Sequence, residues 1–283
     1  MQPIENYFTM LLREIKNIFH VELDKHYAKE EVDSFFYILI EDKLQLERFA
    51  LVLEPNLIIS KEQETILFEG LSRLKVFEPI QYITGKAYFM DLDFVVDKNV
   101  LIPRPETEEL VRWILEKHKV ENNVNSSTYK LKILDIGTGS GCIAISIAKY
   151  LERSEVYGLD ISESALQIAK GNAAENMTAV TFINTDILEV EELEDTYDVI
   201  VSNPPYVREI EKKEMHQNVL EHEPELALFV ANENPLKFYE KIVALAVKNL
   251  NKNGMLYFEI NQYLPKETEQ LLRDYNFTEI ELK

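Results

Sequence analysis

Three glycines, in a chain that has few of them, mark the first candidate site. The sequence contains 8 glycines among 283 residues, and Gly137, Gly139 and Gly141 fall within five positions. Average usage of about 7% would give more than twice as many glycines. A glycine turn lets the backbone approach a ligand closely and points N–H groups at it. The cluster therefore predicts a ligand-binding turn.

An acidic residue narrows the choice of ligand. Asp160 lies 19 residues beyond Gly141, where α/β proteins place a carboxylate that accepts hydrogen bonds from ribose hydroxyls. The dinucleotide fingerprint is G-x-G-x-x-G, but here the spacing is G-x-G-x-G, and Cys142 holds the position of the last glycine. This favours a nucleoside cofactor without a pyrophosphate, such as S-adenosylmethionine, bound by Asp160 and by Gly137, Thr138, Gly139, Ser140 and Gly141.

The second candidate site is the tetrapeptide Asn203-Pro204-Pro205-Tyr206, which follows an apolar run. If that run is a strand of the same parallel sheet, both turns open on the rim where such sheets bind ligands. The two prolines remove N–H donors and stiffen the turn.

These residue types suit the methylation of a planar NH2 group. The lone pair of such a nitrogen is delocalised, so two acceptors must hold its N–H bonds before it can face a sulfonium methyl in line. The side-chain oxygen of Asn203 and the carbonyl of Pro204 can do this, and Tyr206 can stack on the planar group. Catalysis would come from orientation and electrostatics rather than from a strong base.

Alternating strands and helices must position these sites. The hydrophobic pattern predicts strands at 132–136, 156–159, 180–184, 198–202, 255–260 and 277–282, and helices at 141–151, 163–175, 236–250 and 266–275. This alternation is typical of an α/β fold with a mostly parallel sheet covered on both faces.

The first part of the chain has a helical period. Apolar residues recur at helical spacing from Phe8 to Phe19 and again over 30–53. Ser60 followed by Gln63 has the pattern of a capping box. We therefore expect a bundle of four or five helices over residues 1–76.

Aromatic and β-branched residues then predict a β-hairpin at 86–97. We expect this hairpin to lie in a linker spanning 77–102. The α/β domain would then occupy residues 103–283.

Charge and composition limit the partners. The net charge is −20, and residues 185–225 carry 13 acidic but 3 basic side chains. Such a rim repels a phosphate backbone, so no nucleic acid is expected. One cysteine excludes an internal disulfide and fits a cytoplasmic setting, and no apolar run approaches the roughly 20 residues of a membrane span. The five histidines show no metal-ligand spacing, so no metal is expected.

Three blocks resemble the HemK/PrmC family, the N5-glutamine methyltransferases that modify class-1 peptide chain release factors. They are Glu78-Pro-Ile-Gln-Tyr-Ile-Thr-Gly85 through Leu101-Ile-Pro-Arg-Pro-Glu-Thr-Glu-Glu-Leu-Val111, Asp135-Ile-Gly-Thr-Gly-Ser-Gly141, and Ser202-Asn-Pro-Pro-Tyr-Val207 with His222-Glu-Pro-Glu-Leu-Ala-Leu-Phe229. Asn-Pro-Pro-Tyr is shared with DNA adenine methyltransferases, whereas the block from Pro103 to Glu108 is much more specific. The resemblance covers nearly the whole chain.

The resemblance implies a Rossmann-like class I methyltransferase domain that binds S-adenosylmethionine and releases S-adenosylhomocysteine. It implies that the turn from Gly137 to Gly141 wraps the cofactor and that Asp160 holds the ribose. Asp186 and Ile187 would flank the adenine, and Asn203 would serve both the cofactor and the substrate.

On the substrate side, the resemblance implies that Asn203 to Tyr206 hold the glutamine of a Gly-Gly-Gln motif. Arg104 to Thr107 would close over the active site, and the N-terminal bundle would engage the release factor, with the enzyme expected to be a monomer. The chain departs from the family at Val230–Pro235, at Ile187 and at Glu259-Ile-Asn-Gln262.

Other functions stay open on the sequence alone. Glutamine methylation of a ribosomal protein uses the same chemistry. DNA adenine N6-methylation is disfavoured by the acidic rim. A cofactor-binding module without catalysis is disfavoured because Asn203 and Tyr206 are both present.

Overall fold

The computed structural model describes residues 10–119 and 129–283, so Phe8 lies outside the described residues. Two compact units are distinguished. The first contains Met1–Gly85 together with Gln217–His222, and the second contains Lys86–His216 and Glu223–Lys283. Within the described ranges, none of the helices is long and apolar enough to cross a bilayer.

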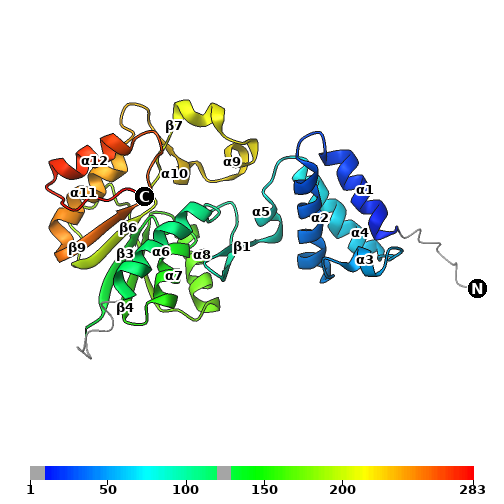
Figure 1. The fold of residues 1–283 in the computed structure, drawn as a ribbon, viewed down its shortest axis with the longest axis horizontal. Helices are drawn as coiled ribbons and strands as arrows, with labels where there is room; N and C mark the ends of the chain where they lie inside the picture. Colours follow the sequence, from blue (N-terminus) through cyan, green and yellow to red (C-terminus); the bar gives the residue numbers. More distant parts are fainter. Residues whose placement is uncertain (1–9, 120–128) are drawn as a thin grey trace, which may run out of the picture. The chain divides into compact units, whose positions relative to one another are not determined.

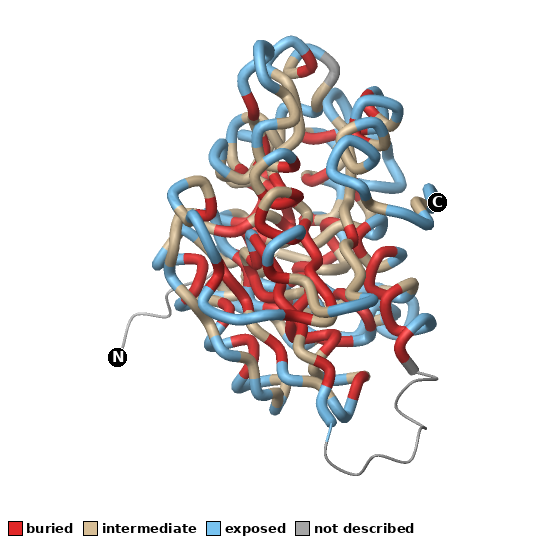
Figure 2. The backbone as a smooth tube through the Cα atoms, turned by 90° about the vertical axis from the view of Figure 1, so that its left-hand side faces the viewer, coloured by how far each residue is buried: buried red, intermediate tan, exposed pale blue. Residues whose placement is uncertain are grey.

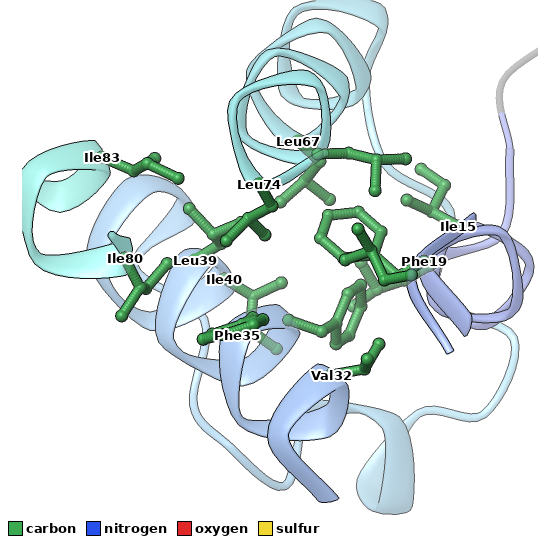
Figure 3. Close-up of a cluster of buried hydrophobic side chains, with 14 of the residues drawn as sticks. Ile15, Phe19, Val32, Phe35, Leu39, Ile40, Leu67, Leu74, Ile80 and Ile83 are labelled. Carbon is green, nitrogen blue, oxygen red and sulfur yellow. The ribbon is translucent and has the colours of Figure 1, made fainter. Parts of the chain in front are cut away.

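Helices make up the first unit, as the apolar spacing predicts (Figure 1). They are α1 (Leu12–Leu23), α2 (Lys29–Leu44), α3 (Ala50–Leu53), α4 (Lys61–Leu74) and α5 (Ile80–Thr84), with α9 (Gln217–His222) added from later in the chain. The apolar faces of the longer helices meet in one cluster, in which Phe19, Leu39 and Leu67 point toward one another (Figure 3). Burial of this shared face stabilises the bundle, because each helix alone would leave its apolar stripe in water.

Helix α4 begins at the predicted capping box. The N–H of Gln63 donates to the Ser60 hydroxyl at 3.3 Å, and the N–H of Ser60 donates to the side-chain oxygen of Gln63 at 2.9 Å. Two backbone donors that lack partners inside the helix are satisfied in this way.

A five-stranded parallel sheet organises the second unit, in the order β5-β4-β3-β6-β9. The strands are β3 (Leu131–Ile136), β4 (Ser154–Asp160), β5 (Val180–Asn184), β6 (Tyr197–Ser202) and β9 (Leu250–Phe258). The chain moves outward from β3 to β5, then returns to pair β6 with the other side of β3. The order therefore reverses between β3 and β6, the kind of switch point at which open α/β sheets bind ligands.

Helices cover both faces of this sheet, which buries most residues of β3 and β6 (Figure 2). On one face, α6 (Pro105–Lys119), α7 (Cys142–Tyr150) and α8 (Glu163–Glu175) lie side by side (Figure 1). On the other, Ile242 and Leu245 of α11 (Lys237–Asn249) pack with Leu134 and Ile200 of the sheet. Helix α12 (Pro265–Asp274) contacts α11.

The predicted hairpin is present and belongs to the second unit. β1 (Lys86–Phe89) and β2 (Leu92–Val95) pair antiparallel. Asn172 of α8 fastens the hairpin, because its side chain accepts the N–H of Val95 at 2.7 Å and donates to the Val95 carbonyl at 3.0 Å. These bonds explain why the hairpin belongs with the sheet.

The prediction of a strand at 277–282 is wrong, because those residues form no strand. Asn276 and Glu279 have φ values of +64° and +54°, which interrupt an extended run. The segment contacts α6 instead: Glu281 pairs with Lys117 at 3.2 Å, and the Lys283 ammonium lies 4.5 Å from the centre of the Trp113 ring.

The capping box makes a prediction about the first unit. Ser60→Ala removes the acceptor for the N–H of Gln63, so we expect the free energy of unfolding to fall by about 1 kcal/mol. Urea unfolding followed by circular dichroism measures the change. Ser72→Ala is the matched control, because Ser72 is an exposed residue inside the same helix whose hydroxyl donates to the carbonyl of Phe68. Equal losses in the two variants would contradict the role of the cap.

Candidate functional site

The ends of β3 and β6 bring the two predicted sites together. Ile136 and Ser202, the last residues of these strands, are paired in the sheet. The buried Ser202 hydroxyl also donates to the Ile136 carbonyl at 2.7 Å. The next residues along the chain are Gly137 and Asn203, so the glycine turn and the tetrapeptide begin at neighbouring points on one rim.

The glycine turn has the shape that a bound ligand needs. Gly137, Gly139 and Gly141 have φ values of +76°, +54° and +83°, a region that favours glycine. A Cβ at Gly137 or Gly139 would meet nothing within 4 Å, whereas one at Gly141 would lie 2.7 Å from Ile145. The first two glycines therefore border open space, and the third packs against the protein.

Asp160 ties this turn to the end of β4. Its Oδ2 accepts the N–H of Gly139 at 2.8 Å, and its Oδ1 accepts the N–H of Ser162 at 2.9 Å. Burial raises the pKa of Asp160 above its usual range. The carboxylate thus holds the glycine turn in shape and lies beside it, where a ribose-binding group is expected.

Two residues inside the turn are also fixed, Thr138 through its side chain and Ser140 through its backbone. The Thr138 hydroxyl donates to Asp135 Oδ2 at 2.6 Å, and burial raises the pKa of Asp135 to about 7. Ser140 is buried, and its carbonyl accepts a hydrogen bond from the Asn172 side chain at 2.9 Å. The turn is therefore held by Asp135 of β3 and by Asn172 of α8.

The residues expected beside an adenine differ in their surroundings. Asp186 follows β5, is half-buried, and accepts the N–H of Leu188 at 2.9 Å. Ile187 is 7% exposed and packs in the cluster that contains Leu134 and Tyr197. Of the two, Asp186 leaves more of its side chain accessible.

The tetrapeptide is anchored by side chains from other elements. Pro204 is buried, whereas Asn203, Pro205 and Tyr206 are partly exposed. Asn203 Nδ2 donates to the hydroxyl of Thr107 at 3.3 Å, and Asn261 donates to the Tyr206 carbonyl at 2.8 Å.

Glu259 is a residue of this site that the sequence argument missed. It directly follows β9, and its N–H donates to the Ser202 carbonyl at 3.1 Å. The hydroxyls of Tyr206 and Thr107 donate to its two carboxylate oxygens at 2.8 and 2.6 Å. Burial and the charge of Glu259 raise the pKa of Tyr206, which keeps that hydroxyl a donor. The feature of the sequence that could have identified Glu259 is its place as a carboxylate directly after a strand of the parallel sheet.

After the tetrapeptide, two short strands pair with each other. β7 (Val207–Arg208) pairs in parallel with β8 (Phe229–Val230), and the 3-10 helix η2 (Glu209–Glu214) and the helix α10 (Glu225–Leu228) lie between them in sequence. Glu211 of η2 pairs with Arg208 of β7 at 2.6 Å.

Arg104 joins two of the sequence blocks that carry the family resemblance. It pairs at 2.6 Å with Glu223, whose side chain is 1% exposed. Burial raises the pKa of Glu223, although Arg104 opposes that rise. Of the stretch expected to close over the site, Thr107 contacts Asn203 directly and Arg104 anchors the later loop.

The acidic residues counted around the tetrapeptide are not all unpaired charges at the rim. Asp198 is near the beginning of β6 and Asp195 lies just before it, at the opposite end of the strand from Asn203. Glu211 and Glu223, which follow the tetrapeptide, are each paired with an arginine. The count over 185–225 therefore overstates the negative charge at the rim.

The glycine turn makes the second prediction. The added methyl group of Gly139→Ala faces open space, so the free energy of unfolding falls only by the cost of a left-handed alanine, roughly 1–2 kcal/mol. We expect this variant to lose mainly ligand affinity. Gly141→Ala adds a clash with Ile145 and costs a further 1–3 kcal/mol or so. Thermal unfolding and binding calorimetry with S-adenosylhomocysteine separate the two effects. Equal stability losses would contradict this division.

This chain is similar to known proteins in both of its units. Residues 127–280 match the family described as a methyltransferase domain, and residues 20–85 match the PrmC N-terminal domain. A release factor glutamine methyltransferase of Flavobacterium psychrophilum is 51% identical over 99% of this chain and 94% of its own length. A protein of the same name from Bacteroides thetaiotaomicron is 46% identical over 83% of this chain and 82% of its own length.

A third relative with that name, from Lactococcus lactis, is 46% identical over 78% of this chain and 77% of its own length. The match to the Flavobacterium psychrophilum protein covers 99% of this chain and so extends across both units. The chain belongs to the release factor glutamine methyltransferase family.

Proposed function

We propose that this chain transfers a methyl group from S-adenosylmethionine to the side-chain N5 of the glutamine in the Gly-Gly-Gln motif of class-1 peptide chain release factors. The observation that carries the proposal is the position of the two segments: Asn203 follows the end of β6, and the glycine turn follows the paired end of β3. The names of the relatives, at up to 51% identity, support a release factor over a ribosomal protein as the substrate.

The residues present fit the cofactor. The open space at Gly137 and Gly139 leaves room for a ligand against the backbone, and the Asp160 carboxylate beside them suits a ribose. Asp186 would lie toward the adenine. When bound, S-adenosylmethionine supplies an electrophilic methyl group on a sulfonium sulfur.

The substrate side works by orientation. The Oδ1 of Asn203 and the carbonyl of Pro204 would accept the two N–H bonds of the glutamine amide, so that its nitrogen faces the methyl donor. Both acceptors also stabilise positive charge as it develops on that nitrogen. The ring of Tyr206, whose hydroxyl is held by Glu259, offers a flat surface for the amide plane. Proximity and alignment would supply most of the rate.

The remaining expectations follow from this substrate. The N-terminal unit would engage the release factor outside its Gly-Gly-Gln motif. A substrate from translation termination would place the reaction in the cytoplasm. Every side chain assigned to the site comes from the second unit of one chain, and we propose that the enzyme acts as a monomer.

Transfer of a labelled methyl group tests the substrate. We expect label on purified release factor, none on a release factor whose motif glutamine is replaced by alanine, and none on ribosomal proteins or duplex DNA. Label that appears only on DNA, or only on a ribosomal protein, would contradict the proposal.

A second experiment tests the role of Asn203. Asn203→Ala removes an acceptor from the substrate, and we expect kcat to fall by about a hundredfold or more. Cofactor affinity should largely survive, because the glycine turn is untouched. Asn234→Ala is the control, since the Asn234 side chain is exposed and donates to Glu240. A near-normal rate for Asn203→Ala would refute the assigned role.

A further inference from the structure

A chain of hydrogen bonds runs from a carboxylate to the side-chain amide of Asn203. The Thr107 hydroxyl donates to Glu259 Oε2 at 2.6 Å, and Asn203 Nδ2 donates to the same hydroxyl oxygen at 3.3 Å. These residues come from α6, from the end of β9 and from the end of β6. All three belong to the second unit.

The direction of this chain is set by chemistry. An ionised carboxylate only accepts hydrogen bonds, and a hydroxyl has a single hydrogen to donate. Because the Thr107 hydrogen is directed to Glu259, the Thr107 oxygen can only accept from Asn203. The amide must therefore turn its NH2 toward Thr107 and its Oδ1 away from it.

We propose that Thr107 and Glu259 are positioning residues that determine which end of the Asn203 amide faces the substrate. The inference rests on the proposed function. With Oδ1 presented, Asn203 attracts the N–H bonds of a glutamine amide. With the amide turned over, its NH2 would attract the glutamine carbonyl oxygen instead, and the nitrogen to be methylated would lie on the wrong side.

The surroundings make the orientation firm. Thr107 is 2% exposed, so water has little access to replace it as the partner of Asn203. Glu259 is itself held through its backbone, which donates to Ser202 at 3.1 Å and accepts from the Tyr239 hydroxyl at 3.0 Å. Its other oxygen accepts from Tyr206 at 2.8 Å. One carboxylate thus orients both polar side chains of the tetrapeptide.

The test compares two substitutions at one position. Thr107→Val keeps the shape but removes the hydroxyl, and we expect kcat for release factor methylation to fall roughly tenfold or more, with KM for S-adenosylmethionine nearly unchanged. Thr107→Ser restores the hydroxyl and should recover most of kcat. Thr268→Val is the matched control, because Thr268 of α12 is also buried but its hydroxyl donates to the backbone carbonyl of Leu264.

Glu259→Gln provides the second variant, because the introduced amide can donate to Thr107 and so favour the reversed chain. We expect kcat to fall at least as far as in Thr107→Val, again with KM for S-adenosylmethionine nearly unchanged. A kcat of Thr107→Val equal to that of the wild type would overturn the inference. If Thr107→Val does not fold, the same result for Glu259→Gln would overturn it. Absence of methyl transfer by the wild-type chain would instead overturn the proposed function.

Discussion

The site depends on the pairing of β3 with β6 up to their last residues. The bond from the Ser202 hydroxyl to the Ile136 carbonyl joins positions that are 66 residues apart in the chain. Because the strands are parallel, the segments that follow them emerge at the same rim. The glycine turn and the tetrapeptide become neighbours in this way, with the sheet core beneath them. Neither segment alone could present a methyl donor to an acceptor.

A second layer of side chains gives the tetrapeptide its fixed geometry. Glu259 accepts from Thr107 and Tyr206, and Arg104 holds the later loop through Glu223. The polar groups are therefore aligned before any substrate binds, which lowers the reorganisation that the reaction requires. Fixed geometry suits the proposed reaction, because an amide nitrogen is a poor nucleophile and must be oriented toward the methyl donor.

Local patterns in the sequence predicted much of this arrangement. The bounds of α8 and β5 were predicted residue for residue, because both segments have clear hydrophobic periodicity. The contacts of Asn203 with Thr107 and of Thr107 with Glu259 join residues that are 96 and 152 positions apart in the sequence. A local sequence pattern cannot predict contacts between residues so far apart in the chain. The strand expected at 277–282 failed because Glu279 adopts a positive φ that its residue type does not signal.

A crystal structure with bound ligands would show which end of the Asn203 amide faces the substrate. The crystals would contain this chain, S-adenosylhomocysteine and a peptide with a Gly-Gly-Gln motif. We expect the glutamine side-chain nitrogen within hydrogen-bonding distance of Asn203 Oδ1 and the Pro204 carbonyl, with Asn203 Nδ2 still donating to Thr107. A glutamine carbonyl oxygen bound to Asn203 Nδ2, or a peptide bound away from this rim, would contradict it.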